Sequence, residues 1–205
     1  MILLNRAALQ ASFAEFRARD APASDLRRAA VAIVLGEDQV DGVVRFLLTQ
    51  RPTTLSAHPG QFALPGGKLD PGETHVQAVV REVGEEVGLT ITADDVVGRL
   101  DDYQTRSGYV IRPFVVWTGH LHQAVPSAAE VATLLRIPAA ALTGSAVPTL
   151  LQLPGGSAPI LQMPLGGGRV VHAPTGALLY QFAGWAFSRR YIDMTSFAEP
   201  EFAWR

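Results

Sequence analysis

The chain has 205 residues, contains no cysteine and carries a formal net charge of −2 at neutral pH. A chain of this length can bury one substantial core, so we expect a single domain that spans residues 1–205. The lack of cysteine excludes disulfide bonds and thiolate metal sites, and we expect a cytoplasmic protein. The near-neutral charge gives no reason to expect nucleic acid as a partner.

The N-terminal sequence predicts an amphipathic helix over residues 5–19. Four apolar side chains recur there at helical spacing: Ala8, Leu9, Phe13 and Phe16. The segment has no basic leader and is interrupted by charges, so it is not typical of a secretion signal. No stretch approaches the ~20 uninterrupted apolar residues of a membrane-spanning helix, and we expect no membrane partner.

Two apolar runs, over residues 27–36 and 43–51, predict strands that are joined by a polar turn with a glycine. A loop with proline and glycine follows, and residues 61–64 predict a short third strand. The next regular element is a helix over residues 74–87, which Gly88 ends.

The second half of the chain continues to alternate strands and helices. We expect two strands around the turn at residues 105–108, then a short helix over residues 127–138 that Ser127 caps. Three short strands over residues 149–173 and a helix over residues 174–190 follow. This order favours one domain with an α/β fold and a mixed sheet.

The helix over residues 74–87 carries an unusual number of carboxylates. Its valines predict one buried stripe: Val76, Val80, Val83 and Val87. Glu82, Glu85 and Glu86 share a neighbouring face, because they stand at positions i, i+3 and i+4. Like charges at this spacing repel by about 0.2–0.5 kcal/mol per pair, unless a hard divalent cation lies among them. A solvated acidic surface is the alternative interpretation.

These acids belong to a longer pattern, because residues 67–89 read G-x5-E-x7-R-E-V-x-E-E-x-G-L. The pattern matches every fixed position of the Nudix box, G-x5-E-x7-R-E-U-x-E-E-x-G-U, in which U is a bulky aliphatic residue. The sequence therefore resembles the Nudix hydrolases over roughly residues 28–140. The resemblance implies a Nudix α/β/α sandwich with a mixed β-sheet, in which the box forms a loop, a helix and a loop.

The resemblance also implies a reaction and a metal. Nudix proteins hydrolyse a diphosphate linked to another moiety, usually in a nucleoside diphosphate derivative, with Mg²⁺ or Mn²⁺. Carried over by position in the box, the implied catalytic metal ligands are Glu82, Glu85 and Glu86, together with the backbone carbonyl of Gly67. Glu73 and Arg81 are the implied structural pair that holds the loop against the helix.

A second stretch, residues 47–67, resembles the signature that precedes the box in coenzyme A pyrophosphatases. The corresponding residues are Leu47, Leu48, Thr49, Arg51, His58, Gly60, Pro65, Gly66 and Gly67. This sequence departs from the signature at Pro52, at Ser56 or a neighbour, where an arginine is usual, and at Leu64, where a phenylalanine is usual. The resemblance implies CoA or an acyl-CoA as substrate, cleaved to phosphopantetheine and adenosine 3′,5′-bisphosphate.

Arg51, His58 and Lys68 are the candidate substrate-binding residues. Arg51 ends a predicted strand before the box loop, where it can face a phosphate or pair with an acid. His58 can contact the ligand or serve as a turn residue beside Pro59. Lys68 is the only lysine of the chain and follows Gly67 in the box loop.

Glu130 is the candidate general base. The box acids are expected to be occupied with metal, so proton removal needs another carboxylate, and Nudix enzymes often place an additional acid in this region. In the first turn of a helix over residues 127–138, Glu130 could instead complement the helix dipole.

Two other functions stay open. One is a Nudix pyrophosphatase that acts on ADP-ribose or a dinucleotide, which the departures at residues 56 and 64 favour. The other is a non-catalytic, nucleotide-sensing Nudix domain, although such domains usually lack box carboxylates and this sequence retains them. Each function has a small nucleotide as partner, and a homodimer is left open.

Overall fold

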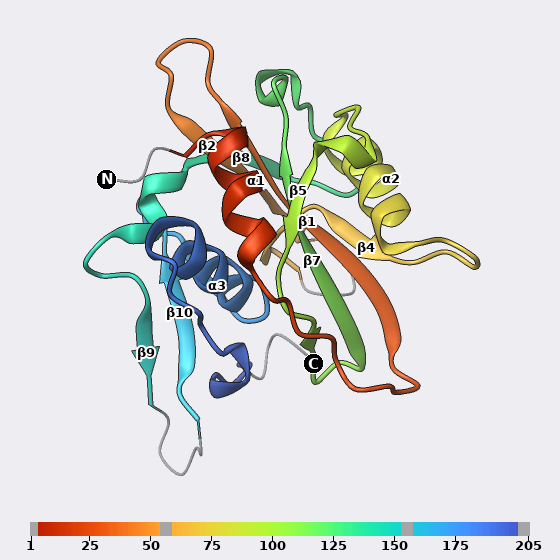
Figure 1. Ribbon diagram of the computed structural model, residues 1–205, viewed down its shortest axis with the longest axis vertical. Helices are drawn as coiled ribbons and strands as arrows, with labels where there is room; N and C mark the ends of the chain where they lie inside the picture. The colour runs from red at the N-terminus through yellow and green to blue at the C-terminus, as the bar shows by residue number, and fades with distance from the viewer. Residues whose placement is uncertain (1–3, 54–58, 153–157, 201–205) are drawn as a thin grey trace.

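The computed structural model describes residues 4–53, 59–152 and 158–200. A mixed β-sheet forms the middle of three layers, with helix α2 (His75–Val87) on one face and helices α1 (Arg6–Glu15) and α3 (Thr175–Ser188) on the other (Figure 1). This arrangement confirms the predicted α/β fold with a mixed sheet. No helix within the described residues combines the length and the apolar character needed to cross a membrane.

Eight strands of the described chain form the main sheet. They are β1 (Arg27–Glu37), β2 (Val44–Gln50), β3 (Phe62–Ala63), β4 (Gly66–Lys68), β5 (Val96–Arg99), β6 (Tyr103–Gln104), β7 (Tyr109–Trp117) and β8 (Thr133–Pro138). Strand β1 is central, because it pairs in parallel with β7 and antiparallel with β2 and β4. The predicted strands around the turn at residues 105–108 are β6 and β7, and β5 pairs with the far half of β7.

The side chains of β1 divide between two hydrophobic cores, because successive residues of a strand point to opposite faces. Ile33 and Leu35 pack with α1 and α3, whereas Ala32 and Val34 pack with α2. All four are completely buried. The strand is therefore apolar throughout, as expected for a strand that is covered on both faces.

A second sheet contains β9 (Thr149–Leu151), β10 (Ile160–Pro164) and β11 (Val170–His172), paired antiparallel. These elements and α3 agree with the strands and the helix predicted after residue 148. Leu161 and Met163 of β10 are completely buried in the same cluster as Ile33 and Leu35, so one core joins the two sheets. Short 3₁₀ helices complete the fold: η1 (Ala93–Asp95), η2 (Leu121–Gln123), η3 (Ala139–Thr143) and η4 (Met194–Ser196).

Helix α1 is shorter than the helix predicted over residues 5–19. Asn5 caps it by accepting a hydrogen bond from the backbone N–H of Ala8. The helix ends at Glu15, and Phe16 packs edge-on against Trp185, with 5.0 Å between ring centroids. The following residues are held extended, because the backbone N–H of Arg19 donates to the carboxylate of Asp101. Tertiary contacts therefore override the helical periodicity.

The prediction of a helix over residues 127–138 is wrong. Residues 128–130 form a turn, and β8 follows as a strand that pairs with β2. Leu135 and Ile137 pack on the α1 and α3 face, whereas Leu134 packs on the α2 face. This alternation has the period of a strand, and the free edge of β2 provides the partner.

Helix α2 begins and ends where the sequence predicts. Thr74 and Gln77 form a capping box at its start, and Gly88 ends it in the left-handed conformation, with φ of +64°. The buried face is broader than the predicted stripe. The completely buried side chains are those of Ala78, Val79, Val83 and Val87, while Val76 and Val80 are half-buried.

Strand β4 can approach β1 only because residue 66 is glycine. Gly66 has φ of +147°, and a Cβ atom there would overlap the backbone of Ala30 and Val31. We expect Gly66→Ala to destabilise the fold by about 3 kcal/mol or more, since the two strands must separate. Urea denaturation with an unchanged m-value measures this loss.

Gly72 provides the matched control for this substitution. Its φ is +82°, but a Cβ atom there would meet nothing within 4 Å. Gly72→Ala is therefore expected to cost only the left-handed backbone strain, about 1–2 kcal/mol. Equal losses in the two variants would contradict the role of close packing at Gly66.

Candidate functional site

The pairing of β1 with β4 brings two glycine backbones against the acids of α2. The backbone N–H of Gly66 donates to the Oε2 atom of Glu86 at 3.1 Å. The carboxylate of Glu82 lies against Gly67 so closely that a Cβ atom at residue 67 would overlap it. The absence of side chains at Gly66 and Gly67 thus lets carboxylates reach the main chain of the box loop.

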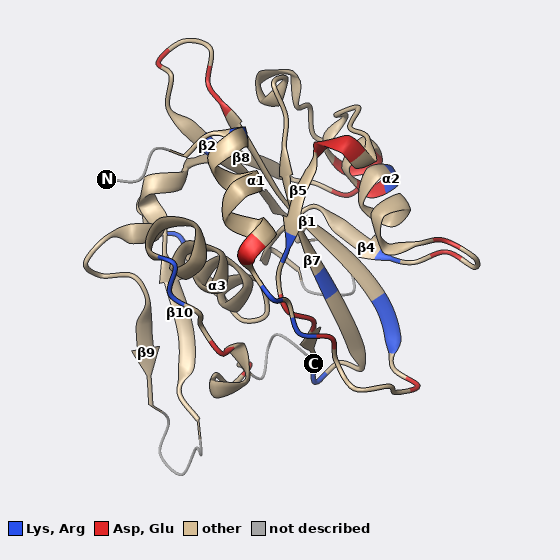
Figure 2. Ribbon diagram, viewed as in Figure 1, with Lys and Arg blue, Asp and Glu red and all other residues tan. Residues whose placement is uncertain are grey.

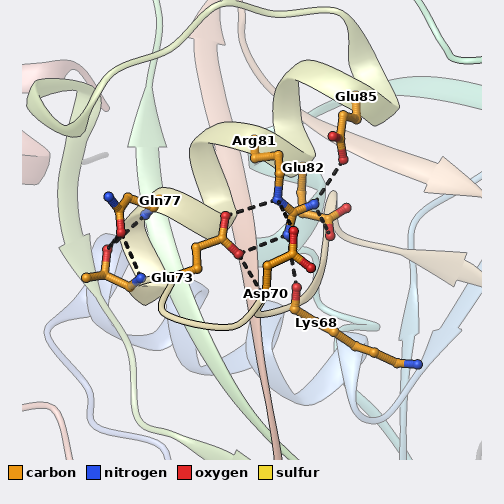
Figure 3. A network of polar contacts seen from close by, with 8 residues as sticks. Lys68, Asp70, Glu73, Gln77, Arg81, Glu82 and Glu85 are labelled. Carbon is orange, nitrogen blue, oxygen red and sulfur yellow. Dashed lines mark hydrogen bonds and ion pairs between the residues drawn. The ribbon is translucent and has the colours of Figure 1, made fainter.

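Arg81 lies at the centre of the polar network in Figure 3. Its Nε and Nη2 atoms donate to the two carboxylate oxygens of Glu73, each at 3.0 Å. Nη2 also donates to the carbonyl of Lys68, and Nη1 donates to Glu82 and Glu85, each at 2.9 Å. These contacts use all five N–H groups of the guanidinium. The implied structural pair of Glu73 and Arg81 is confirmed.

The three box acids lie in different environments. Glu85 is exposed, with 56% of its side-chain surface accessible, whereas Glu82 retains 13%. Glu86 is buried, with 6% of the residue exposed. Burial raises the pKa of Glu86 from its ordinary 4.5 to about 7, against the effect of the Gly66 hydrogen bond. Burial also raises the pKa of Glu82, although the hydrogen bond from Arg81 opposes this shift.

Glu130 lies near these acids, on a loop that is bonded to the end of α2. Its charge contributes to the raised pKa of both Glu82 and Glu86. The backbone N–H of Ser127 donates to the carbonyl of Glu86 at 2.8 Å, and that of Val131 donates to the carbonyl of Ser127. Glu130 is exposed and belongs to a turn, so complementing a helix dipole does not explain its position.

The structure places the three candidate substrate-binding residues differently. Arg51 follows β2, and its charge opposes the raised pKa of Glu86, so it lies on the side of the acids. The ammonium group of Lys68 lies 5.8 Å from the ring centroid of Tyr109 and points away from the acids (Figure 3). His58 lies outside the described residues.

The oxygen-rich donor set fits a hard divalent cation such as Mg²⁺ or Mn²⁺. Within residues 4–53, 59–152 and 158–200, no group of three or more histidine, aspartate or glutamate side chains is already arranged to hold a metal. The contacts explain this, because Arg81 engages Glu82 and Glu85 while Gly66 engages Glu86. Glu86 is nevertheless a buried carboxylate whose hydrogen-bond donor is uncharged, which is an environment that a cation would stabilise.

The sequence matches the family described as "NUDIX domain" over residues 25–139, and the chain belongs to the Nudix family. It is 37% identical over 119 residues to Nudix hydrolase 22, chloroplastic, of Arabidopsis thaliana, covering 55% of this chain and 38% of that protein. It is 40% identical over 90 residues to the uncharacterized Nudix hydrolase NudL of Escherichia coli, covering 43% of this chain and 45% of that protein. The match thus spans less than half of each relative.

Two solved structures share the fold. The NUDIX hydrolase from Alicyclobacillus acidocaldarius superposes with a TM-score of 0.55 at 17% identity, covering 86% of this chain and 99% of that one. The MutT/nudix family protein from Enterococcus faecalis gives a TM-score of 0.51 at 15% identity, covering 74% of this chain and 52% of that one. At these identities the similarity concerns the fold alone.

Sequence reasoning missed two features of the site. It did not identify the N–H group of Gly66 as a donor to Glu86, and it did not predict that Glu86 would be buried. A signal was available, because Glu86 lies beside Val79 on the helical wheel, at the edge of the predicted apolar stripe. The bond from Ser127 to the end of α2 depends on a loop conformation and has no such signal.

The raised pKa of Glu86 predicts a pH-dependent cost in the metal-free protein. The carboxyl group is more easily ionised in the unfolded chain, so stability is lost as the pH rises from about 4.5 through about 7. Glu86→Gln removes this loss and retains an acceptor for Gly66. We expect the variant to be more stable above pH 8 by up to about 3 kcal/mol, with little difference at pH 4.

Chemical denaturation in EDTA across this pH range measures the difference. Glu85→Gln is the matched control, because Glu85 is exposed and its removal deletes one box carboxylate without relieving burial. A Glu86→Gln variant that is equally stabilised at pH 4 and pH 8 would contradict the assignment to ionisation of Glu86.

Proposed function

We propose that this protein is a divalent-metal-dependent hydrolase of a nucleoside diphosphate linked to another moiety. The observation that carries the proposal is the placement of Glu82 and Glu86 against the glycine backbone of β4, with Glu86 buried and the charge of Glu130 acting on both. Such an arrangement costs stability unless a cation binds, which supports a role in function. The retained box carboxylates argue against a non-catalytic sensing domain.

The proposed metal-holding residues are Glu82, Glu85 and Glu86, together with the carbonyl of Gly67. A bound Mg²⁺ or Mn²⁺ would neutralise phosphate charge and make a water molecule more acidic. Arg81 keeps the box loop joined to α2 through Glu73 and Lys68, so Gly67 stays beside Glu82. These contacts therefore hold the acids of α2 in a fixed position relative to the box loop.

We propose Glu130 as the general base. Glu130 is exposed, its charge acts on Glu82 and Glu86, and the N–H groups of Arg81 donate to other acceptors. A water molecule would lose a proton to Glu130 as its oxygen bonds to one phosphorus. The bond from that phosphorus to the bridging oxygen breaks, and the other phosphate leaves as an anion.

Arg51 is the proposed phosphate-binding side chain. It lies at the end of β2, and its charge already acts on Glu86. A guanidinium can donate two parallel hydrogen bonds to a phosphate, which would orient the diphosphate toward the acids. His58 and Lys68 remain proposed contacts to more distant parts of the substrate.

The proposed substrate is CoA or an acyl-CoA, on the basis of residues 47–67. Leu64, one of the departures from that signature, is 3% exposed and packs in the hydrophobic core. Replacement of a phenylalanine by leucine there concerns packing, so it does not count against CoA. The proposed products are phosphopantetheine and adenosine 3′,5′-bisphosphate.

ADP-ribose or a dinucleotide is the second candidate substrate. Ser56, in place of the arginine of the signature, removes a side chain that could grip a phosphate. This observation favours a substrate without the 3′-phosphate that CoA carries in addition to its diphosphate.

Removal of divalent metal is the first test. Without a cation, the acids repel the anionic diphosphate, so excess EDTA is expected to abolish turnover of any diphosphate substrate. Addition of Mg²⁺ or Mn²⁺ beyond the chelator should restore it, which serves as the control for irreversible damage. Full turnover in EDTA would overturn the proposed chemistry.

Glu130→Gln tests the proposed base. We expect kcat to fall by about 10²–10⁴, with a melting temperature close to that of the parent because the side chain is exposed. Glu37→Gln, at an exposed glutamate at the end of β1, is the matched control and should leave kcat unchanged. An unchanged kcat in Glu130→Gln would assign proton removal to another group.

A substrate panel separates the two candidate classes. CoA, dephospho-CoA, ADP-ribose, NADH and a diadenosine polyphosphate are incubated with the protein and Mg²⁺, and the products are separated by chromatography. We expect kcat/KM to be highest for CoA, with adenosine 3′,5′-bisphosphate as a product. Rapid hydrolysis of ADP-ribose, with CoA and dephospho-CoA both inert, would favour the second candidate.

A further inference from the structure

A cavity of about 850 Å³ lies where the segment after α1, the loop after β5 and the C-terminal segment meet. Its lining includes Arg19, Asp101, Tyr103, Arg106 and Glu199. Acidic and basic segments lie close together where the chain follows α1 (Figure 2). The volume is within the range of roughly 300–1,000 Å³ that is typical of small-molecule sites.

The lining of the cavity shares no residue with the acidic cluster of α2. Tyr103, in its lining, packs in the hydrophobic core with α1 and α3. Val83 and Val87, which flank the box acids, pack in the core on the opposite face. A ligand in the cavity would therefore contact residues other than those of the proposed diphosphate site.

Asp101 and Glu199 line the cavity and are buried, each with 6% of the residue exposed. Asp101 accepts hydrogen bonds from Gln181 at 3.0 Å and from the hydroxyl of Tyr191 at 2.6 Å. Glu199 accepts from the backbone N–H of Arg106 at 3.2 Å and from Tyr103. These partners fix the positions of the two carboxyl groups with uncharged donors.

The other acidic residues of the lining form ion pairs with arginines. Asp102 pairs with Arg112 at 2.7 Å, and Asp20 pairs with Arg99 at 2.9 Å. Asp193 lies 3.7 Å from Arg19 at the exposed mouth. The charge of Arg106 acts on Glu199, but the residue is exposed. Among the charged residues of the lining, Asp101 and Glu199 are therefore buried, whereas Arg19 and Arg106 are exposed.

An apolar wall faces part of the same space. Ile160 and Met194 are buried and Phe197 is half-buried, and all three line the cavity. Apolar surface next to fixed carboxyl groups suits an amphipathic ligand, because the hydrocarbon part leaves water while a cationic part finds its acceptors.

We propose that this cavity binds a small organic ammonium compound. Its nitrogen donates hydrogen bonds to Glu199 and Asp101, and its hydrocarbon part packs against Ile160, Met194 and Phe197. An anionic ligand of the same size is disfavoured, since its charge would meet two buried carboxyl groups. This site goes beyond the proposed hydrolase function and does not depend on it.

Three matched probes test the charge of the ligand: 2-phenylethylamine, 2-phenylethanol and 3-phenylpropionate. Isothermal titration calorimetry on the full chain at pH 7.5, without metal, is expected to give a Kd of about 1 mM for the amine. The alcohol and the acid should bind at least about tenfold more weakly. Equal or tighter binding of the acid, or no binding of the amine, would overturn the proposal.

Two variants locate the binding. Glu199→Gln keeps the shape of the side chain and removes its charge, so the Kd of the amine is expected to rise about tenfold. Ala21→Trp adds bulk to the lining without altering a charge and should weaken the amine by a similar factor. Glu15→Gln, at the exposed end of α1, is the control and should leave the Kd unchanged.

The use of two variants keeps the test decisive if one of them does not fold. If Glu199→Gln does not fold, Ala21→Trp alone decides the location. Amine binding that survives in every folded variant would place the ligand elsewhere and overturn the proposal.

Discussion

The acid site depends on the guanidinium of Arg81. One side chain joins the box loop, through Glu73 and the carbonyl of Lys68, to two carboxylates on its own helix. Its hydrogen bond also lowers the pKa of Glu73. A lysine has three donors without the planar fork and could not hold all these acceptors in one geometry. The same contacts that shape the loop also neutralise part of the acidic cluster, so structure and charge balance are linked through one residue.

Glu86 differs from the carboxylates that Arg81 neutralises. It is placed beside a backbone N–H group rather than a cation, and burial makes its ionised form costly. Val83 and Val87 of the same helix are completely buried. Their burial offsets the unfavourable free energy of an ionised Glu86. The apolar surface of α2 thus stabilises a helix whose acids, taken alone, would destabilise it.

The sequence predicted the parts of the fold that depend on local pattern. Thr74 and Gly88 bound α2 as expected, and the alternation of apolar runs located β1 and β2. The failures arose where a distant partner decides the conformation. Phe16 leaves α1 to pack on Trp185, and residues after Glu130 become a strand because β2 offers a free edge. In the site, the shared face of the acids follows from helical spacing and the Glu73–Arg81 pair follows from the resemblance to the Nudix box, whereas the bond from Gly66 to Glu86 requires the β1–β4 pairing.

The parallel pairing of β1 with β7 has a consequence for the order of folding. It joins Arg27 to Tyr109 and Leu35 to Trp117, so a long loop that contains all of α2 must close before the pair forms. Closing such a loop costs entropy, and folds with distant contacts form slowly. Helix α2 can form early from its own caps, but its docking surface includes Phe114 and Val116 of β7 as well as Val34 of β1. In a chain that is still being synthesised, the apolar docking surface of α2 is therefore complete only after β7 has emerged from the ribosome.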